Sequence, residues 1–133
     1  MDICIAAMLS ATVLARVPGH LTLAWEHTVE KVRWEEDYVA RDGALELVEA
    51  RIRGTGAGME MPPEAEPANG AWRYRPRLPP LRQIYVRNIA LPLGYDLCWN
   101  GVCRRLTTLI GSRNDMLVLM PCTVSSGLRS MSS

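Results

Sequence analysis

The sequence predicts an all-β protein: a single-domain sandwich or partly open barrel of about nine short, mainly antiparallel strands. Three observations lead to this fold class. Segments of strand length recur between Gly, Pro and Asn turn signals, residues 21–28 alternate between two faces, and Asn100-Gly101 separates two strand-like runs. The chain has 133 residues, enough for one core. We expect one β domain over residues 1–122 and a flexible polar tail over residues 123–133.

Composition and charge argue against two broad classes of protein. The net charge is +1, and the 15 basic residues, all Arg except Lys31, are interspersed with 14 acidic residues. This pattern is typical of a solvated surface and lacks the clustered basic charge of a nucleic-acid binder. No apolar run reaches the roughly 18 residues that a membrane span needs. We therefore expect no nucleic-acid partner and no transmembrane span.

The N-terminal run from residue 3 to residue 15 has two interpretations. It is compatible with the hydrophobic region of a secretory signal cleaved after Val13-Leu14-Ala15, although Asp2 stands where such signals carry Lys or Arg. The alternative is a pair of short strands at residues 3–7 and 12–17. Pro18-Gly19 is then a turn into the next strand.

Residues 21–37 begin as an alternating strand that we expect to be central. Its apolar face carries Leu21, Leu23 and Trp25, and the same alternation places His27 on that face. A glycine-dense loop, RGTGAGME, follows one strand later, and we expect it to meet this stretch and form a site. Several acids lie near His27 along the chain: Glu30, Glu35, Glu36 and Asp37.

The stretch from residue 34 to residue 52 is compatible with a helix or a hairpin. Leu45, Val48 and Ile52 have helical spacing. Asp42-Gly43, however, is a two-residue hairpin signal between two strand-like runs. We favour the hairpin, in which Glu49 and Arg51 share one face.

The second half of the chain alternates between loops and short strands. Three glycines within residues 54–58 make a regular element unfavourable, and residues 61–68 are expected to be a proline-rich surface loop. Strands are expected at three places, with Trp72 and Tyr74 sharing a face in the first: residues 71–76, 82–88 and 116–122.

The clearest local signal is YDLCWNGVCRRL, residues 95–106. Asn100-Gly101 suits a type I′ turn, in which both central residues need positive φ. Cys98 and Cys103 then form a non-hydrogen-bonded pair with Cα atoms roughly 4.5 Å apart, so their sulfurs lie within bonding reach. The pairs that the turn defines are Trp99 with Val102, Cys98 with Cys103, and Leu97 with Arg104.

The four cysteines allow three disulfide pairings if all are bonded. We favour Cys98–Cys103 together with Cys4–Cys122, because the second bond would join the first strand to the last. Free buried thiols in a reducing compartment are the alternative. A zinc site is not expected, since the C-x4-C spacing is wide and only two histidines could complete the ligands.

His27 is the residue whose own context indicates a site. A histidine on an apolar strand face is usually a satisfied core residue, but a neighbouring carboxylate can tune it as an acid–base group or ligand. The sequence contains no G-x-S-x-G motif, and its glycine loop lacks the Lys-Ser/Thr ending of a phosphate-binding loop. We favour a non-enzymatic protein without a cofactor. The alternative is a small-ligand-binding or hydrolytic domain at the His27 and glycine-loop site.

Four segments together resemble one bacterial family: WEHTVEKVRWEEDY, VEARIRGTGAGME, AWRYRPRLPPL and YDLCWNGVCRRL. They are similar, in the same order, to the domain of unknown function 1850, and the resemblance runs from about Ile3 to Leu106. Its most specific parts are residues 27–30, HTVE, and residues 56–59, GAGM. The resemblance implies a polar set of His27, Thr28, Glu36, Glu49 and Arg51. With Glu30, Gly56 and Gly58 these residues form our candidate binding cluster.

The resemblance implies a context more than an activity. Such proteins are similar to small partners encoded beside TRAP transporters of the TAXI type, so the implied partners are the transporter membrane subunits or its substrate-binding protein. A periplasmic or membrane-peripheral location is implied as well. In this chain Met1-Asp2 directly precedes the strand-like Ile3-Cys4-Ile5, and that start would favour the cytoplasm.

Overall fold

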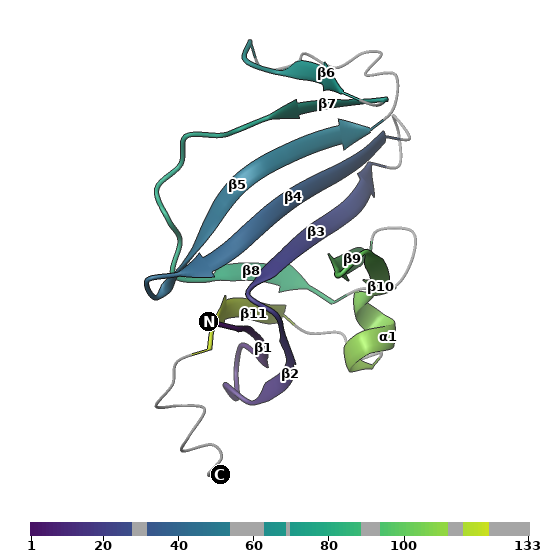
Figure 1. Ribbon diagram of the computed structural model, residues 1–133. Coiled ribbons are helices and arrows are strands. Elements are labelled where there is room, and N and C mark those ends of the chain that lie inside the picture. The colour runs from purple at the N-terminus through teal and green to yellow at the C-terminus, as the bar shows by residue number, and fades with distance from the viewer. Residues whose placement is uncertain (28–31, 54–62, 69, 89–93, 112–115, 123–133) are drawn as a thin grey trace.

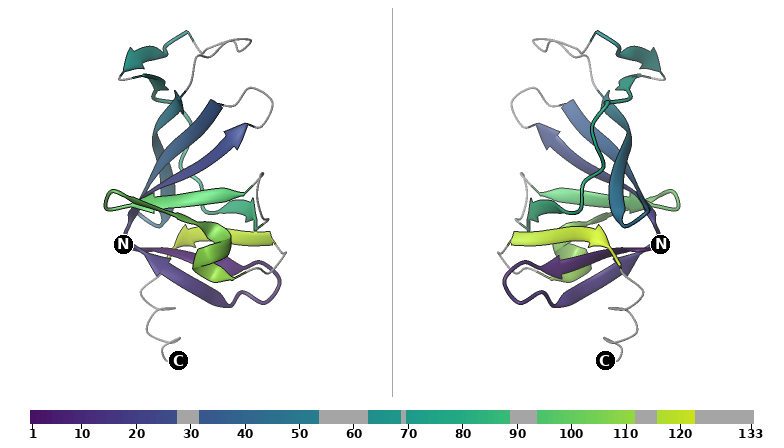
Figure 2. Two further views of the ribbon diagram at one scale, coloured as in Figure 1. Left: turned by 90° about the vertical axis from the view of Figure 1, so that its right-hand side faces the viewer. Right: turned by 90° about the vertical axis from the view of Figure 1, so that its left-hand side faces the viewer.

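The computed structural model describes residues 1–27, 32–53, 63–68, 70–88, 94–111 and 116–122. This part of the chain contains eleven strands and one short helix. The strands form a 4-stranded sheet, β2-β1-β11-β8, and a 7-stranded sheet, β10-β9-β3-β4-β5-β7-β6. Figure 1 shows the long strands of the larger sheet rising above the smaller one, and Figure 2 shows the same arrangement from both sides. The all-β prediction is confirmed: the described pairings are antiparallel, and the arrangement is sandwich-like and not closed into a barrel.

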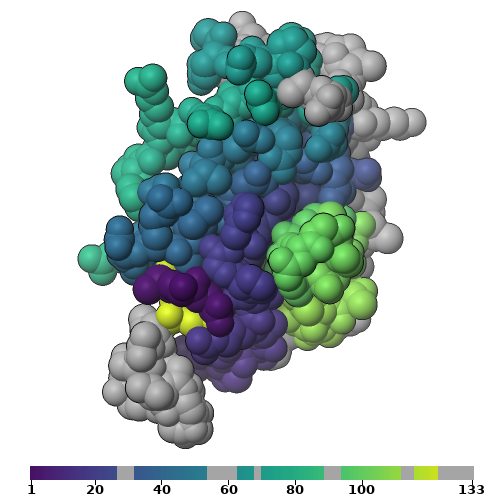
Figure 3. All heavy atoms as spheres, in the orientation of Figure 1, coloured from purple at the N-terminus to yellow at the C-terminus, as the bar shows by residue number. Residues whose placement is uncertain are grey.

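The smaller sheet is built around the first strand. All five residues of β1 are buried, and β1 lies between β2 and β11. The two-strand interpretation of residues 3–17 therefore agrees with the structure. Figure 3 shows the first residues of the chain against the last described ones on the surface. The strands of this sheet are β1 (Ile3–Ala7), β2 (Val13–Val17), β8 (Ile84–Arg87) and β11 (Met116–Pro121).

The larger sheet contains the predicted hairpin at Asp42-Gly43. Both residues have positive φ, 54° and 76°, as a two-residue type I′ turn requires. The hairpin prediction is confirmed over the helix. The strands of this sheet are β3 (His20–His27), β4 (Val32–Arg41), β5 (Ala44–Arg53), β6 (Glu66–Ala68), β7 (Ala71–Tyr74), β9 (Tyr95–Trp99) and β10 (Val102–Arg105).

A β-bulge interrupts the β4–β5 pairing. Tyr38 pairs with Leu47, but Asp37 pairs with Glu49, so Val48 is the extra residue. Leu45 and Leu47 face the core before the bulge, and Ala50 and Ile52 continue that face after it. The bulge thus decides which polar side chains of β5 lie opposite those of β4.

The hairpin at Asn100-Gly101 has the register that the sequence predicts, with Cys103 paired to Cys98 and Val102 to Trp99. The two cysteines are bonded, with Cα atoms 3.9 Å apart. Cys4 and Cys122 are also bonded, across a separation of 118 residues. Both favoured pairings are therefore confirmed.

Two elements differ from the expectation. Residues within the expected proline-rich loop form β6, where Pro67 is tolerated because β6 is the edge strand of the sheet. A five-residue helix, α1 (Leu106–Ile110), follows β10, and its buried residue Leu106 anchors it to the core. The glycine-dense segment 54–58 and the tail at 123–133 lie outside the described residues.

The core lies between the inner faces of the two sheets. Leu21, Leu23 and Leu97 of the larger sheet pack with Ile5 and Leu117 of the smaller one. Burial of these side chains is the main favourable contribution to folding. No helix within the described part of the chain is long and apolar enough to cross a membrane.

Candidate functional site

The outer face of the larger sheet, which points away from the core, carries a row of charged side chains. Strand alternation places Arg33, Glu35 and Asp37 of β4 on this face, opposite Arg51 and Glu49 of β5. With side chains from β9 and β10 they form what we call the ion-pair network. Its members are Arg33, Glu35, Asp37, Glu49, Arg51, Arg53, Asp96 and Arg105.

Arg51 is the centre of the ion-pair network. Its Nε donates to Glu35 at 2.9 Å, and its Nη1 donates to Asp37 and Glu49, both at 2.7 Å. Nη2 donates to the second oxygen of Asp37 at 2.7 Å, so the contact with Asp37 is bidentate. Charge-assisted bonds of this geometry are among the strongest that side chains make. The three carboxylates raise the pKa of the Arg51 guanidinium above its ordinary value, the hydrogen bonds to Asp37 being the largest cause.

Glu35 is the most buried carboxylate of the network, with 9% of its surface exposed. Burial raises its pKa, but hydrogen bonds from Arg51, Arg53 and Arg33 lower it, and the net pKa is below the ordinary value. Asp37 behaves in the same way: burial raises its pKa, and the bonds from Arg51 and from the Thr22 hydroxyl, at 2.6 Å, bring it below the ordinary value. Both carboxylates are therefore held in the ionised form.

Arg33 extends the network across β3 to β9. Its Nε donates to Glu35 at 3.1 Å and its Nη1 donates to Asp96 at 3.3 Å. Ala24 of β3 pairs with Glu35 on one side and with Asp96 on the other. Its small side chain leaves room for the Arg33 guanidinium to cross β3. Arg105 of β10 also binds Asp96, at 3.1 Å. Four arginines and four carboxylates thus form an electroneutral network over four strands.

Glu36 lies on the opposite, inner face of the same strand. It pairs with Leu23 and Ala50, both buried, and its carboxylate accepts a hydrogen bond from the Tyr38 hydroxyl at 2.8 Å. Burial raises the pKa of Glu36, and the bond from Tyr38 offsets this only in part. Burial and the charge of Glu36 in turn raise the pKa of Tyr38.

The structure describes only part of the candidate binding cluster that the sequence predicts. The structure brings Glu49 and Arg51 into direct contact and places Glu36 on the other face of the sheet. Thr28, Glu30, Gly56 and Gly58 lie outside the described residues, as does the side chain of His27, so that part of the cluster stays a prediction. Sequence reasoning did not single out the remaining members of the network, Arg33, Glu35, Asp37, Arg53, Asp96 and Arg105, as site residues. The alternation in RWEED and EARIR was the signal for the members on β4 and β5, whereas Asp96 and Arg105 pair in the register of the Asn100-Gly101 hairpin.

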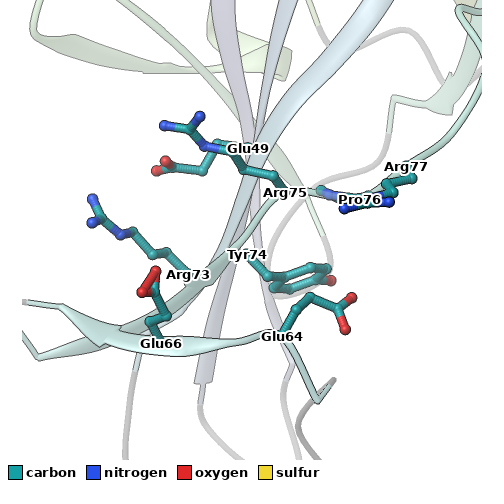
Figure 4. Close-up of a pocket in the computed structure, with 8 residues that line it drawn as sticks. All are labelled: Glu49, Glu64, Glu66, Arg73, Tyr74, Arg75, Pro76 and Arg77. Atoms are coloured by element: carbon teal, nitrogen blue, oxygen red, sulfur yellow. The ribbon is translucent and has the colours of Figure 1, made fainter.

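A second charged feature, which we call the arginine groove, lies at the end of β7. This surface cavity has a volume of about 550 Å³ and is lined by Glu49, Glu64, Glu66, Arg73, Tyr74, Arg75, Pro76 and Arg77. Figure 4 shows Arg73 and Arg75 extending on the same side as Glu49 and Glu66, with Tyr74 and Glu64 on the other side. Within the described chain, no carboxylate lies within 4.0 Å of the Arg73, Arg75 or Arg77 guanidinium, unlike the guanidinium of Arg51.

Fold and site together define an all-β, sandwich-like domain with an electroneutral ion-pair network beside an arginine-lined groove. No cluster of three or more potential metal ligands occurs among the residues that the structure describes. The chain belongs to the family described as domain of unknown function 1850, whose profile matches residues 21–106. No curated protein and no solved structure matches the chain significantly.

Proposed function

We propose that this chain is a non-enzymatic binding and interaction module, an accessory protein of a TAXI-type TRAP transport system. The transport context rests on the family resemblance of the sequence. The interaction role rests on one structural observation, the exposed arginines of the groove that lack a carboxylate partner among the described residues. Its partner is a transporter membrane subunit or the substrate-binding protein.

The protonation behaviour of the ion-pair network supports a structural role for the outer sheet face. A general acid at neutral pH needs a carboxyl group whose pKa is raised towards that pH. Glu35 and Asp37 have lowered pKa values because arginines hold them ionised. They are suited to fixing the strands relative to one another and so to presenting a rigid neighbouring surface.

The arginine groove is suited to a protein partner. Arg and Tyr are the residue types enriched at the energetic centres of protein interfaces. Small-molecule pockets are usually enclosed and mostly apolar, whereas this cavity is lined by arginines and glutamates together with Tyr74. Mixed charge of this kind fits a complementary protein surface that carries carboxylates opposite Arg73 and Arg75.

Co-purification tests the proposal directly. The tagged chain is expressed with the transporter membrane subunits and the substrate-binding protein of the same gene cluster, and association is measured. We expect the double variant Arg73→Glu/Arg75→Glu to lose most of the bound partner. The matched control is Arg82→Glu/Arg87→Glu, which makes the same charge change at two exposed arginines outside the groove.

The outcomes separate the parts of the proposal. Equal loss in both double variants would show that overall charge, not the groove, drives the association. Failure of the unmodified chain to associate with any of these proteins at micromolar concentration would overturn the transport role. The alternative, a small-ligand-binding or hydrolytic domain at His27 and the glycine loop, stays a prediction, and ligand-induced shifts in melting temperature that His27→Ala removes would favour it.

A further inference from the structure

The two disulfides differ in how accessible they are from solvent. Cys4, on β1, and Cys122, which directly follows β11, are 6% and 5% exposed. Cys103 lies on the edge strand β10 and is exposed, and its partner Cys98 is partly exposed. A thiol in solution can therefore reach the Cys98–Cys103 bond in the folded protein but not the Cys4–Cys122 bond.

A cation lies beside the exposed disulfide. Arg33 Nη2 is 4.0 Å from the Cys98 sulfur and 3.9 Å from the Cys103 sulfur. The other two nitrogens of this guanidinium are held by Glu35 and Asp96, so Nη2 is the one directed at the sulfurs. A positive charge at this distance favours the thiolate form of a cysteine, which is both the nucleophile and the leaving group of disulfide exchange.

A cavity gives access to the same bond. Its volume is about 370 Å³, and both cysteines line it together with Trp99, Asn100 and Gly101 of the hairpin. Residues of β3 and β5 also line it, among them His20, Thr22 and Arg53. The space next to the sulfurs is large enough for a side chain that carries an attacking thiolate.

We propose that Cys98–Cys103 is a thiol–disulfide exchange site that operates in the folded protein with a dithiol reductant. The dithiol's thiolate attacks the exposed Cys103 sulfur, a mixed disulfide forms, and the Cys98 sulfur leaves with the bonding electron pair beside Arg33. The second thiol loses its proton to solvent, closes the reductant's own disulfide and releases Cys103. Two electrons pass to the protein, and the two cysteine thiolates take up protons from water.

The proposal does not depend on the arginine groove or on a transport role. It distinguishes a redox-responsive bond at the sheet edge from a permanent bond in the core. Opening the exposed bond removes the side-chain cross-link between β9 and β10, which stay joined through the turn at Asn100-Gly101. The Cys4–Cys122 bond, which joins the first strand to the last, stays intact through the same reaction.

The test treats the folded, full-length chain with dithiothreitol, traps thiols with iodoacetamide and locates them by mass spectrometry. We expect Cys98 and Cys103 to be alkylated while Cys4 and Cys122 stay bonded and the far-UV circular dichroism is unchanged. Reduction of both bonds at one rate, or of neither bond until denaturant is added, would overturn the proposal.

Three variants test the role of Arg33, with reduced glutathione as the attacking thiol. Arg33→Gln should slow opening roughly threefold, because the Cys98 thiolate then leaves without a neighbouring positive charge to stabilise it. Arg105→Gln is the matched control: it also removes a guanidinium from Asp96 but contacts neither sulfur, and its rate should equal that of the unmodified protein. Arg33→Lys keeps the charge and should retain most of the rate. Equal rates for Arg33→Gln and Arg105→Gln would refute the role of Arg33.

Discussion

Arg51 on β5 and Arg73 on β7 pair directly across neighbouring strands of the larger sheet. Arg51 is 18% exposed in its side chain and contacts three carboxylates. Arg73 is exposed and lines the arginine groove, with no carboxylate within 4.0 Å among the described residues. Two arginines in the same alternating pattern, ARIR and WRY, therefore have different surroundings: one is enclosed by three carboxylates, and the other is exposed.

The difference arises from the strands on either side. β5 lies next to β4, on which Glu35 pairs directly with Arg51 and Asp37 lies within ion-pair distance of it. β7 has the short edge strand β6 on its far side, whose exposed Glu66 is opposite Arg73 but not within ion-pair distance. The side chain's own strand pattern does not distinguish the two cases. Each arginine has a glutamate directly opposite it, and what differs is that β5 lies inside the sheet whereas β7 adjoins the exposed edge strand.

The largest difference in stability is expected when each of these two arginines is replaced by alanine. Arg51→Ala leaves Glu35, Asp37 and Glu49 without their shared cation in a mostly buried setting. We expect the free energy of unfolding to fall by about 3 kcal/mol, as when one partner of a buried pair is removed. Arg73→Ala should change it by no more than about 0.5 kcal/mol. Urea unfolding followed by circular dichroism measures both values.

The matched variant for this comparison is Arg53→Ala. Arg53 contacts Glu35 at 3.0 Å as Arg51 does, but its side chain is 45% exposed. Solvent screens such a pair, so a loss of no more than about 1 kcal/mol is expected. If Arg51→Ala and Arg53→Ala cost the same, burial is not what makes Arg51 central.

Much of the fold could be predicted because its signals are local. Alternation and the Asp42-Gly43 and Asn100-Gly101 turns lead directly to strands β3, β4, β5, β9 and β10. The register at Asn100-Gly101 follows from the turn alone, since a two-residue loop leaves no freedom in pairing. β6 and α1 were not predicted because their short sequences carry weak local preferences, and contacts with β7 and with the core stabilise them instead.

The site could not be predicted to the same extent because the bulge at Val48 changes the register. Without it, the turn at Asp42-Gly43 would place Glu36 opposite Glu49, and Glu36 would share a face with Arg51. With it, Glu35 pairs with Arg51 and Glu36 faces the core. The alternation of core-facing apolar residues in β5 shifts by one residue between Leu47 and Ala50, and this shift is the signal that could have revealed the bulge.

Acid should weaken the ion-pair network. The pKa values of Glu35 and Asp37 lie below their ordinary values of 4.5 and 3.8, so the unfolded chain binds more protons than the folded one. Their contribution to stability is present above about pH 5 and is lost as the pH falls through the lowered values. The urea midpoint should therefore decrease between pH 5 and pH 2.

Variants identify the source of this pH dependence. Arg51→Ala should flatten much of the decrease, because hydrogen bonds from Arg51 are the largest of the causes that lower both pKa values. Arg73→Ala should retain the full decrease. The same decrease in both variants would assign the acid sensitivity to other carboxylates and would contradict a central role for Arg51.

The smallest effect is expected at Glu36, the inner-face neighbour of Glu35 on the same strand. Its pKa is raised above the ordinary value of 4.5, with burial the largest cause, so ionisation of Glu36 opposes folding. By linkage, the stability that Glu36 contributes is present below about pH 4.5 and is lost as the pH rises through the raised value. Glu36→Gln keeps an oxygen that accepts from the Tyr38 hydroxyl and removes the charge.

Glu36→Gln should therefore raise the free energy of unfolding at pH 7 by on the order of 0.5 kcal/mol, with the gain disappearing at pH 4. Glu35→Gln is the matched control, because the same substitution one residue earlier removes a charge that three arginines bind. It should lower the stability at pH 7. Urea midpoints of the two variants at both pH values test the opposite signs. If both substitutions destabilise the protein at pH 7, the surroundings of Glu36 stabilise its charge as fully as the network stabilises the charge of Glu35. The proposed difference between the two faces of β4 would then be wrong.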